Sequence, residues 1–114
     1  MLMVIGKMKM AQSAMHDIAE DIVELVPQVL KEDGCVHYSL AVENNKNGLI
    51  PVCEVWRDDA ALTVHLEQPW VIDFSTKFMP LLETHTPKIF NGDFVKNFGE
   101  YSRCAPLSRQ GHAA

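Results

Sequence analysis

The sequence predicts an α+β fold of the ferredoxin-like βαββαβ type, in which helices cover one face of an antiparallel sheet. Three observations indicate this class. A long amphipathic helical pattern follows an apolar, strand-like start of the chain. A turn-rich cluster then separates two further strand-like stretches, and shorter helical patterns lead into a last one.

Residues 3–10 are expected to form the first strand, because β-branched residues come early and Lys alternates at positions 7 and 9. A long helix is expected over about residues 14–33, with Ser13 as its N-cap and Gly34 as the left-handed residue that ends it. Pro27 should bend this helix. Its apolar face recurs at three- and four-residue steps: Met15, Ile18, Ala19, Ile22, Leu25, Val26, Val29 and Leu30.

The second and third strands are expected at residues 35–43 and 49–56, joined as a hairpin by the turn residues 44–48. Pro51 lies inside the third strand and lacks a backbone N–H group. An edge position or a bulge is therefore expected at that residue.

Two shorter helices should follow the hairpin. Asp58 or Asp59 is expected to cap the first, which ends near Leu66. Pro69 should begin the second, which ends near Leu82.

The last strand is expected to open at residues 87–90, to break at Asn91–Gly92 and to continue over residues 94–98. Residues 1–101 are thus expected to form one domain, a common size for a single core. The polar, small residues 102–114 are expected to form a flexible C-terminal tail.

Composition excludes several classes of partner. The 114 residues carry a net charge of −5 with scattered Lys and Arg, which argues against nucleic-acid binding. No apolar run is long enough to span a bilayer, and Lys7 and Lys9 follow the apolar start rather than precede it, unlike a signal peptide. The odd count of three cysteines favours a reducing cytoplasm. Cys35 and Cys53 could pair across the hairpin, but two buried free thiols are favoured.

The stretch from Glu54 to Trp70 contains the most informative motif of the chain. It shows Glu-x-Trp at the end of a strand, an Ala-Leu helix start, His65 nine residues after Trp56, and then Leu-x-x-Pro ending at Pro69. This arrangement resembles the signature of the antibiotic biosynthesis monooxygenase domain, the family of small dimeric quinol monooxygenase-like proteins. Members of that family commonly have a second His where this chain has Trp70.

The resemblance implies a dimeric α+β barrel in which two copies pack through their sheets. The second strand gives independent support for a homodimer, because its residues are apolar or amphipathic on both faces, whereas a solvated face should be more polar. One face carries Val36, Tyr38, Leu40 and Val42, and the other carries Cys35, His37 and Ala41.

The resemblance also implies a cofactor-independent monooxygenase that oxidises a small aromatic phenol or quinol with O₂ in an apolar pocket. His65 would assist proton transfer, Trp56 would stack on the substrate, and Glu54 would accept a hydrogen bond or a proton. For Trp56 and His65 the alternative is a structural role in the core. Haem-degrading relatives use an Asn on the first strand, and residues 1–10 contain none.

Further residues are expected to bind the substrate. His37 or Tyr38 would orient it, whereas Trp70, Phe74 and Phe78 form a helical stripe that would roof the cavity. Each member of this stripe has the alternative of a plain core residue. His85, where the last helix gives way to a strand, is a further candidate.

No metal and no organic cofactor is expected, because the chain lacks His-x-x-x-His and Glu-x-x-His pairs as well as nucleotide-binding glycine motifs. Two other functions stay open. One is a non-catalytic dimer that binds a small hydrophobic ligand or serves a stress response. The other is an isomerase of a small phosphorylated metabolite, which needs cations in the pocket from Lys7, Arg57 or Lys88.

Overall fold

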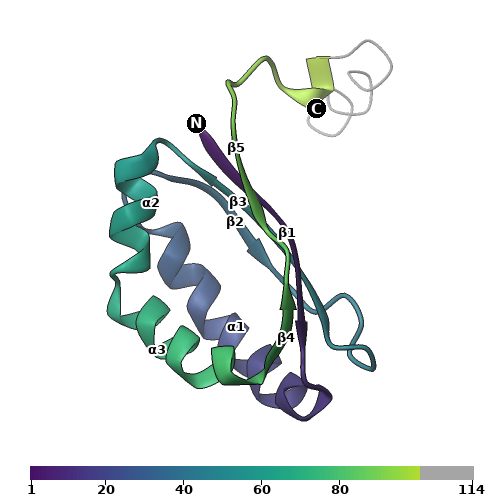
Figure 1. Cartoon of the computed structure of the whole chain (residues 1–114). Coiled ribbons are helices and arrows are strands. Elements are labelled where there is room, and N and C mark those ends of the chain that lie inside the picture. The colour runs from purple at the N-terminus through teal and green to yellow at the C-terminus, as the bar shows by residue number, and fades with distance from the viewer. Residues whose placement is uncertain (101–114) are drawn as a thin grey trace, which may run out of the picture.

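A five-stranded antiparallel sheet carries all three α-helices on one face in the computed structural model, which describes residues 1–100 (Figure 1). The predicted tail at 102–114 lies outside the described residues, as does Cys104. The strands are β1 (Leu2–Met10), β2 (Cys35–Leu40), β3 (Leu49–Trp56), β4 (Leu82–His85) and β5 (Lys88–Asn91). The helices are α1 (Met15–Leu30), α2 (Asp59–Leu66) and α3 (Pro69–Phe78), with 3-10 turns η1 (Gln12–Ala14), η2 (Met79–Leu81) and η3 (Phe98–Glu100). This architecture confirms the predicted α+β, ferredoxin-like class.

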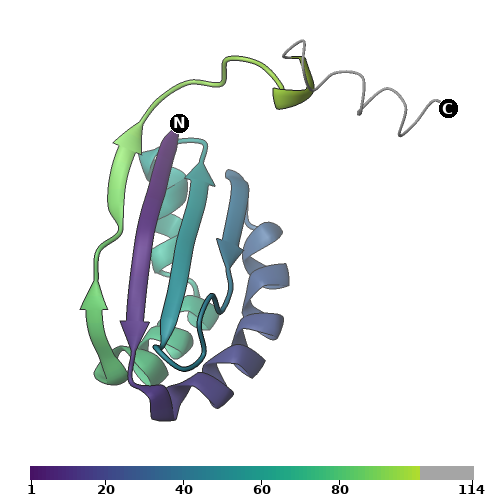
Figure 2. The same cartoon turned by 90° about the vertical axis from the view of Figure 1, so that its right-hand side faces the viewer.

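The sheet has the order β2-β3-β1-β4, and β5 also pairs with β1. β1 therefore lies at the centre, antiparallel to β3 on one side and to the short strands β4 and β5 on the other. β4 pairs with the Met8–Met10 end of β1, whereas β5 pairs with its Leu2–Ile5 end. Figure 2 shows the face of this sheet that carries no helix.

Helix α1 differs from its prediction at both ends. Ser13 was expected to cap it, but this residue lies within η1, and neither η1 nor α1 has a side-chain cap. The prediction of that cap was wrong because the chain already turns into helical geometry before α1 begins. Leu30 is the last residue of α1, and Gly34 has the expected positive φ of 84°.

The β2–β3 hairpin shows why Pro51 is tolerated inside the sheet. β3 has the predicted bounds, whereas β2 ends at Leu40, opposite Val52. Pro51 pairs with Lys7 of β1 but has no partner on β2. The expected edge thus exists only locally, within a strand that is otherwise interior.

The two cysteines of this hairpin do not face each other. Cys35 lies opposite Trp56, and Cys53 lies opposite Ser39. Both are free thiols, as expected, but both are half-buried rather than buried.

The chain after α3 departs most from its prediction. β4 was not predicted, and the strand expected over residues 94–98 is absent, since residues 92–97 have no regular structure. The reason is that β5 ends at Asn91 opposite Leu2, so β1 has almost no length left for a further partner. Met1 and Gly92 close this end of the sheet with two hydrogen bonds, from Met1 N to Gly92 O at 2.8 Å and from Gly92 N to Met1 O at 3.0 Å.

The core lies between the helices and the sheet. Its largest fully buried side chains are Trp56, Phe78, Met10, Met15, Ile18, Ile50 and Val29. No helix among residues 1–100 is long and apolar enough to cross a membrane.

The other face of the sheet, which we call the open face, has no helix over it. It also presents apolar side chains: Met3, Ile5, Cys53, Val55 and Phe90.

Gly6 allows the connection between β4 and β5 to lie directly on β1. A Cβ atom at this position would stand 2.4 Å from Cα of Pro87, which is backbone and cannot move aside. Glycine in a strand is otherwise unfavourable, so the close approach explains its presence here.

We predict that Gly6→Ala lowers the free energy of unfolding by about 1–3 kcal/mol, because the added methyl group overpacks the strand against Pro87. Urea denaturation checks this, with the exposed Lys9→Ala as the control, which should change stability by less than about 0.5 kcal/mol. A Gly6→Ala variant more stable than wild type would contradict the close approach.

Candidate functional site

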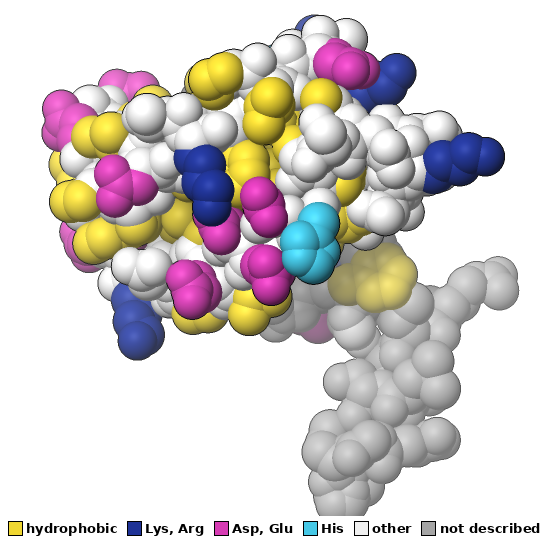
Figure 3. Space-filling view, turned by 90° about the horizontal axis from the view of Figure 1, so that it is seen from below, with side chains coloured by type: hydrophobic (Ala, Val, Ile, Leu, Met, Phe, Trp, Pro, Cys, Tyr) yellow, Lys and Arg dark blue, Asp and Glu magenta, His cyan; other side chains and the backbone are white. Residues whose placement is uncertain are grey.

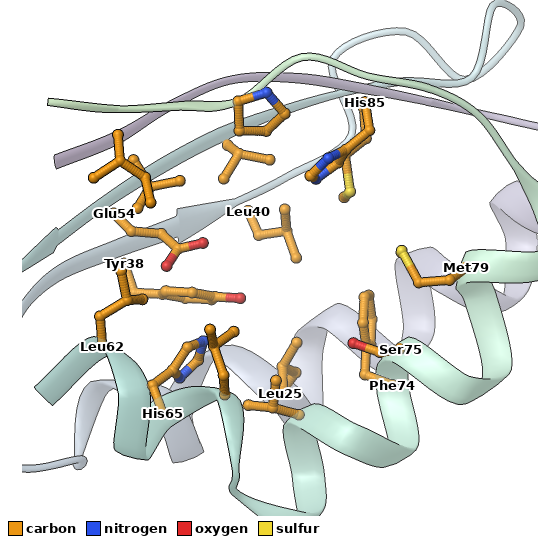
Figure 4. Close-up of a pocket in the computed structure, with 17 residues that line it drawn as sticks. Leu25, Tyr38, Leu40, Glu54, Leu62, His65, Phe74, Ser75, Met79 and His85 are labelled. Carbon is orange, nitrogen blue, oxygen red and sulfur yellow. The ribbon is translucent and has the colours of Figure 1, made fainter. Parts of the chain in front are cut away.

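A cavity of about 230 Å³ lies between the sheet and the helices α2 and α3 (Figure 4). Most of its lining is apolar and comes from every layer of the fold, including Leu25, Leu40, Val52, Leu62, Phe74 and Ile89. Polar side chains reach it at two ends. Tyr38, Glu54 and His65 lie together at one end, and His85 lies at the other (Figure 4).

The fold brings His65 to the cavity through a well-capped short helix. Asp58 accepts a hydrogen bond from the backbone N–H of Ala61 at 2.9 Å, which fixes the start of α2 as predicted. His65 then falls in the last turn of α2, with a side chain only 3% exposed. Its ring packs on Trp56, with centroids 4.5 Å apart, and on Tyr38 at 5.6 Å.

Glu32 is a residue of this site that the sequence did not reveal. It follows the end of α1, and its side chain is 7% exposed. Its two carboxylate oxygens lie 3.0 and 3.1 Å from Nδ1 of His65, and Oε2 accepts a hydrogen bond from Nε1 of Trp70 at 2.8 Å. Separations of 33 and 38 residues leave no local sequence pattern that could have signalled these contacts.

Trp56 supports the site from behind. It is fully buried and is not among the residues that line the cavity. Its indole N–H donates to Oε1 of Glu54 at 2.9 Å, and its ring forms the surface on which His65 packs. The structure thus brings Trp56, Glu54 and His65 together, but it does not place the indole where a substrate would stack.

Burial controls the ionisation of the two polar groups beside His65. It raises the pKa of the Glu54 carboxyl, and the hydrogen bond from Trp56 opposes part of that rise. Burial, and then the nearby carboxylates of Glu54 and Glu32, also raise the pKa of the Tyr38 phenol well above its usual value. Tyr38 therefore presents a neutral hydroxyl to the cavity.

The other residues predicted to bind substrate divide into three groups. Phe74 lines the cavity, and Phe78 is buried behind it with ring centroids 4.9 Å apart. Trp70 does not line the cavity and instead contacts Glu32 on the outer side. His37 is exposed and is not brought to the site, because Tyr38 next to it points inward and neighbouring strand residues point to opposite faces.

One group of possible metal ligands occurs within residues 1–100, and it lies away from this cavity. His16, Asp17 and Glu20 stand close together on α1, but all three are exposed. Acidic, basic and apolar side chains are all exposed on the surface seen from below (Figure 3). Exposed acidic groups of this kind are common on helices, and this one gives no support for a metal centre.

The cavity combines the features that proton-transfer chemistry needs. Nδ1 of His65 is held by Glu32, so Nε2 is the nitrogen left for a bound molecule. The hydroxyl of Tyr38 and the carboxyl of Glu54 stand next to it in a mostly apolar chamber, where electrostatic interactions are stronger than in water.

We predict that Glu54→Gln is more stable than wild type at neutral pH. The pKa of Glu54 is raised in the folded state, so the native protein binds this proton more tightly than the unfolded chain. The stability of the wild type therefore falls as pH rises above about 4.3, the ordinary value for Glu, and the full penalty is present above the raised folded value.

Thermal unfolding of both proteins between about pH 4 and pH 8 measures this difference, which should grow with pH and vanish near pH 4. Glu67→Gln, an exposed position at the end of α2, is the control and should show no such trend. A difference independent of pH would contradict the buried carboxyl.

Comparisons with known proteins agree with this fold. The family model described as "Antibiotic biosynthesis monooxygenase" matches residues 1–77. A crystal structure of an antibiotic biosynthesis monooxygenase is 24% identical with a TM-score of 0.69, covering 84% of this chain and 100% of the other. A protein from Pseudomonas aeruginosa is 27% identical with a TM-score of 0.66, covering 83% and 94% of the two chains.

A protein from Deinococcus radiodurans shows the same likeness at 18% identity, with a TM-score of 0.72 over 86% of this chain and 98% of that one. A search of curated proteins found no match. Because the family model covers well over half of the 114 residues, the chain belongs to the antibiotic biosynthesis monooxygenase family.

Proposed function

We propose that this protein is a cofactor-independent monooxygenase that oxidises a small aromatic phenol or quinol with O₂. The observation that carries this proposal is the buried His65, whose free ring nitrogen borders an apolar cavity next to Glu54 and Tyr38. Membership of the monooxygenase family supports the same reaction class.

The size and lining of the cavity favour a flat substrate of one or two rings. An apolar cavity of roughly 150 Å³ suffices for benzene, whereas drug-sized ligands occupy roughly 300–1,000 Å³. The volume of about 230 Å³ lies between these values. Apolar walls at Leu40, Leu62 and Phe74 suit the faces of such a ring system.

In the proposed reaction the substrate itself is the reductant. Removal of the phenolic proton by Nε2 of His65 makes the ring electron-rich enough to pass one electron to O₂. The two radicals then combine, which forms a bond between oxygen and a ring carbon that bears hydrogen, para to the phenolate in a simple phenol and ortho to it in a quinol. Loss of water, with one proton from His65 and one from that carbon, leaves a quinone.

Glu54 and Tyr38 are proposed to orient the substrate. Their positions at the same end as His65 would place a phenolic hydroxyl within reach of all three groups. The neutral Tyr38 hydroxyl would donate a hydrogen bond to the phenolate as charge develops. Phe74 would contact the far ring edge.

We predict that His65→Gln lowers the rate of O₂ uptake with a naphthalene-diol by roughly 10²-fold or more, the usual contribution of a general base. An oxygen electrode measures the rate. His16→Gln removes an imidazole whose side chain is 85% exposed on α1 and should leave the rate unchanged. Equal rates for wild type and His65→Gln would remove this residue from the mechanism.

A binding protein without catalysis remains the alternative function, since the apolar lining alone suits a hydrophobic ligand. Tight binding of the naphthalene-diol without O₂ uptake would favour it.

The isomerase of a phosphorylated metabolite has less support. No Lys or Arg of residues 1–100 lines the cavity, and Arg57 instead contacts the exposed carboxylates of Asp33 and Asp58.

We also propose that the protein is a homodimer that pairs through the open face. Ile5 and Phe90 on this face are each 48% exposed, although apolar surface of this kind is normally covered. Two copies related by a twofold axis would bury the same patch on each.

Free Cys35 and Cys53 favour a reducing compartment such as the cytoplasm.

We predict that Ile5→Glu converts a dimer into a monomer, because it places a charge in the apolar contact. Size-exclusion chromatography with light scattering gives the mass. Val23→Glu is the matched control, since Val23 is 72% exposed on α1. A monomeric wild type, or an Ile5→Glu variant that stays dimeric, would contradict this interface.

A further inference from the structure

We propose that Glu32 and Trp70 are positioning residues that hold His65 as the tautomer with its proton on Nδ1. In that tautomer Nε2 presents its lone pair to the cavity. The inference rests on the proposed function, because it explains how His65 is prepared to accept a phenolic proton.

The geometry around Nδ1 favours a proton on that nitrogen. The two oxygens of Glu32 stand at nearly equal distances from it, 3.0 and 3.1 Å. An N–H group that points between two carboxylate oxygens gives this arrangement. A protonated carboxyl that donates to Nδ1 would instead bring one oxygen clearly closer than the other.

Trp70 strengthens this assignment because an indole N–H can only donate. Its Nε1 lies 2.8 Å from Oε2 of Glu32, so that oxygen must accept. A carboxyl proton could therefore stand only on Oε1, and the nearly equal distances from the two oxygens to Nδ1 disfavour it there. A residue at position 70 that could also accept a hydrogen bond would not impose this direction.

The same contacts would stabilise the product of proton transfer. When Nε2 takes a proton, His65 becomes an imidazolium whose positive charge faces the carboxylate of Glu32. Both side chains are more than nine-tenths buried, so solvent screens this interaction little. The buried Asp of the serine-protease catalytic triad likewise fixes the tautomer of its histidine base and stabilises the imidazolium.

A purely structural role for Glu32 makes a different prediction. It would tie together the ends of α1 and α2 and the start of α3 without regard to the tautomer of His65. Glu32→Gln separates the two roles, because its amide oxygen can accept from Trp70 while its NH₂ group donates to Nδ1. That exchange moves the His65 proton to Nε2.

The experiment is ¹⁵N NMR of the histidine rings in the full-length, ligand-free protein, at a pH where the imidazoles are neutral. Loss of one signal set in His65→Gln assigns the resonances of His65. We expect the Nδ1–H tautomer in wild type and in Glu32→Asp, which keeps an acceptor. We expect the Nε2–H tautomer in Glu32→Gln, whereas Glu24→Gln, an exposed change on α1, should resemble wild type.

A wild-type spectrum with the Nε2–H tautomer overturns the inference, as does a folded Glu32→Gln variant that keeps the Nδ1–H form. If Glu32→Gln does not fold, the wild-type spectrum still decides.

In turnover, Glu32→Gln should lower kcat by at least about tenfold with little change in KM. An absence of turnover in every variant would contradict the proposed function, but the tautomer would still be read directly.

Discussion

The contact of His65 and Trp70 with the buried carboxylate of Glu32 is the interaction on which the site depends. Glu32 follows the end of α1, where the helix dipole disfavours a negative charge. Two N–H donors from α2 and α3 compensate for this position and for the loss of water. The three helices thereby meet at one buried polar point, and the cavity opens between them and the sheet.

A second glutamate and tryptophan form a similar pair on the sheet. Glu54 and Trp56 stand two residues apart on β3 and hence on the same face, where the indole donates to the carboxyl. His65 packs between this pair and Glu32. The imidazole is thus fixed both by its tilted contact with the Trp56 ring and by a hydrogen bond to Glu32, which leaves one ring nitrogen to act on a ligand.

The sequence predicted those elements whose signals are local. The strand β3 begins after a turn-rich segment and ends before the helix cap Asp58, so its bounds were predicted correctly. The start of α2 was also predicted, because Asp58 caps this helix with its own side chain. β4 reads Leu-Glu-Thr-His and shows no strand pattern, because its conformation comes from pairing with β1. The family motif pointed to His65, which lines the cavity, whereas the contacts of Glu32 arise only when residues far apart in the chain are packed together.

The two tryptophans of this chain are both tied to the site by their indole N–H groups, one to Glu54 and the other to Glu32. All of the indole emission of the protein therefore originates next to the carboxylates that surround His65. Neither ring lines the cavity, but each is linked to it by a contact, Trp56 through Glu54 and Trp70 through Glu32 and His65, so a bound molecule is expected to change the emission through these contacts. The protein consequently carries its own optical reporter of occupancy, and no extrinsic dye is needed to follow a titration.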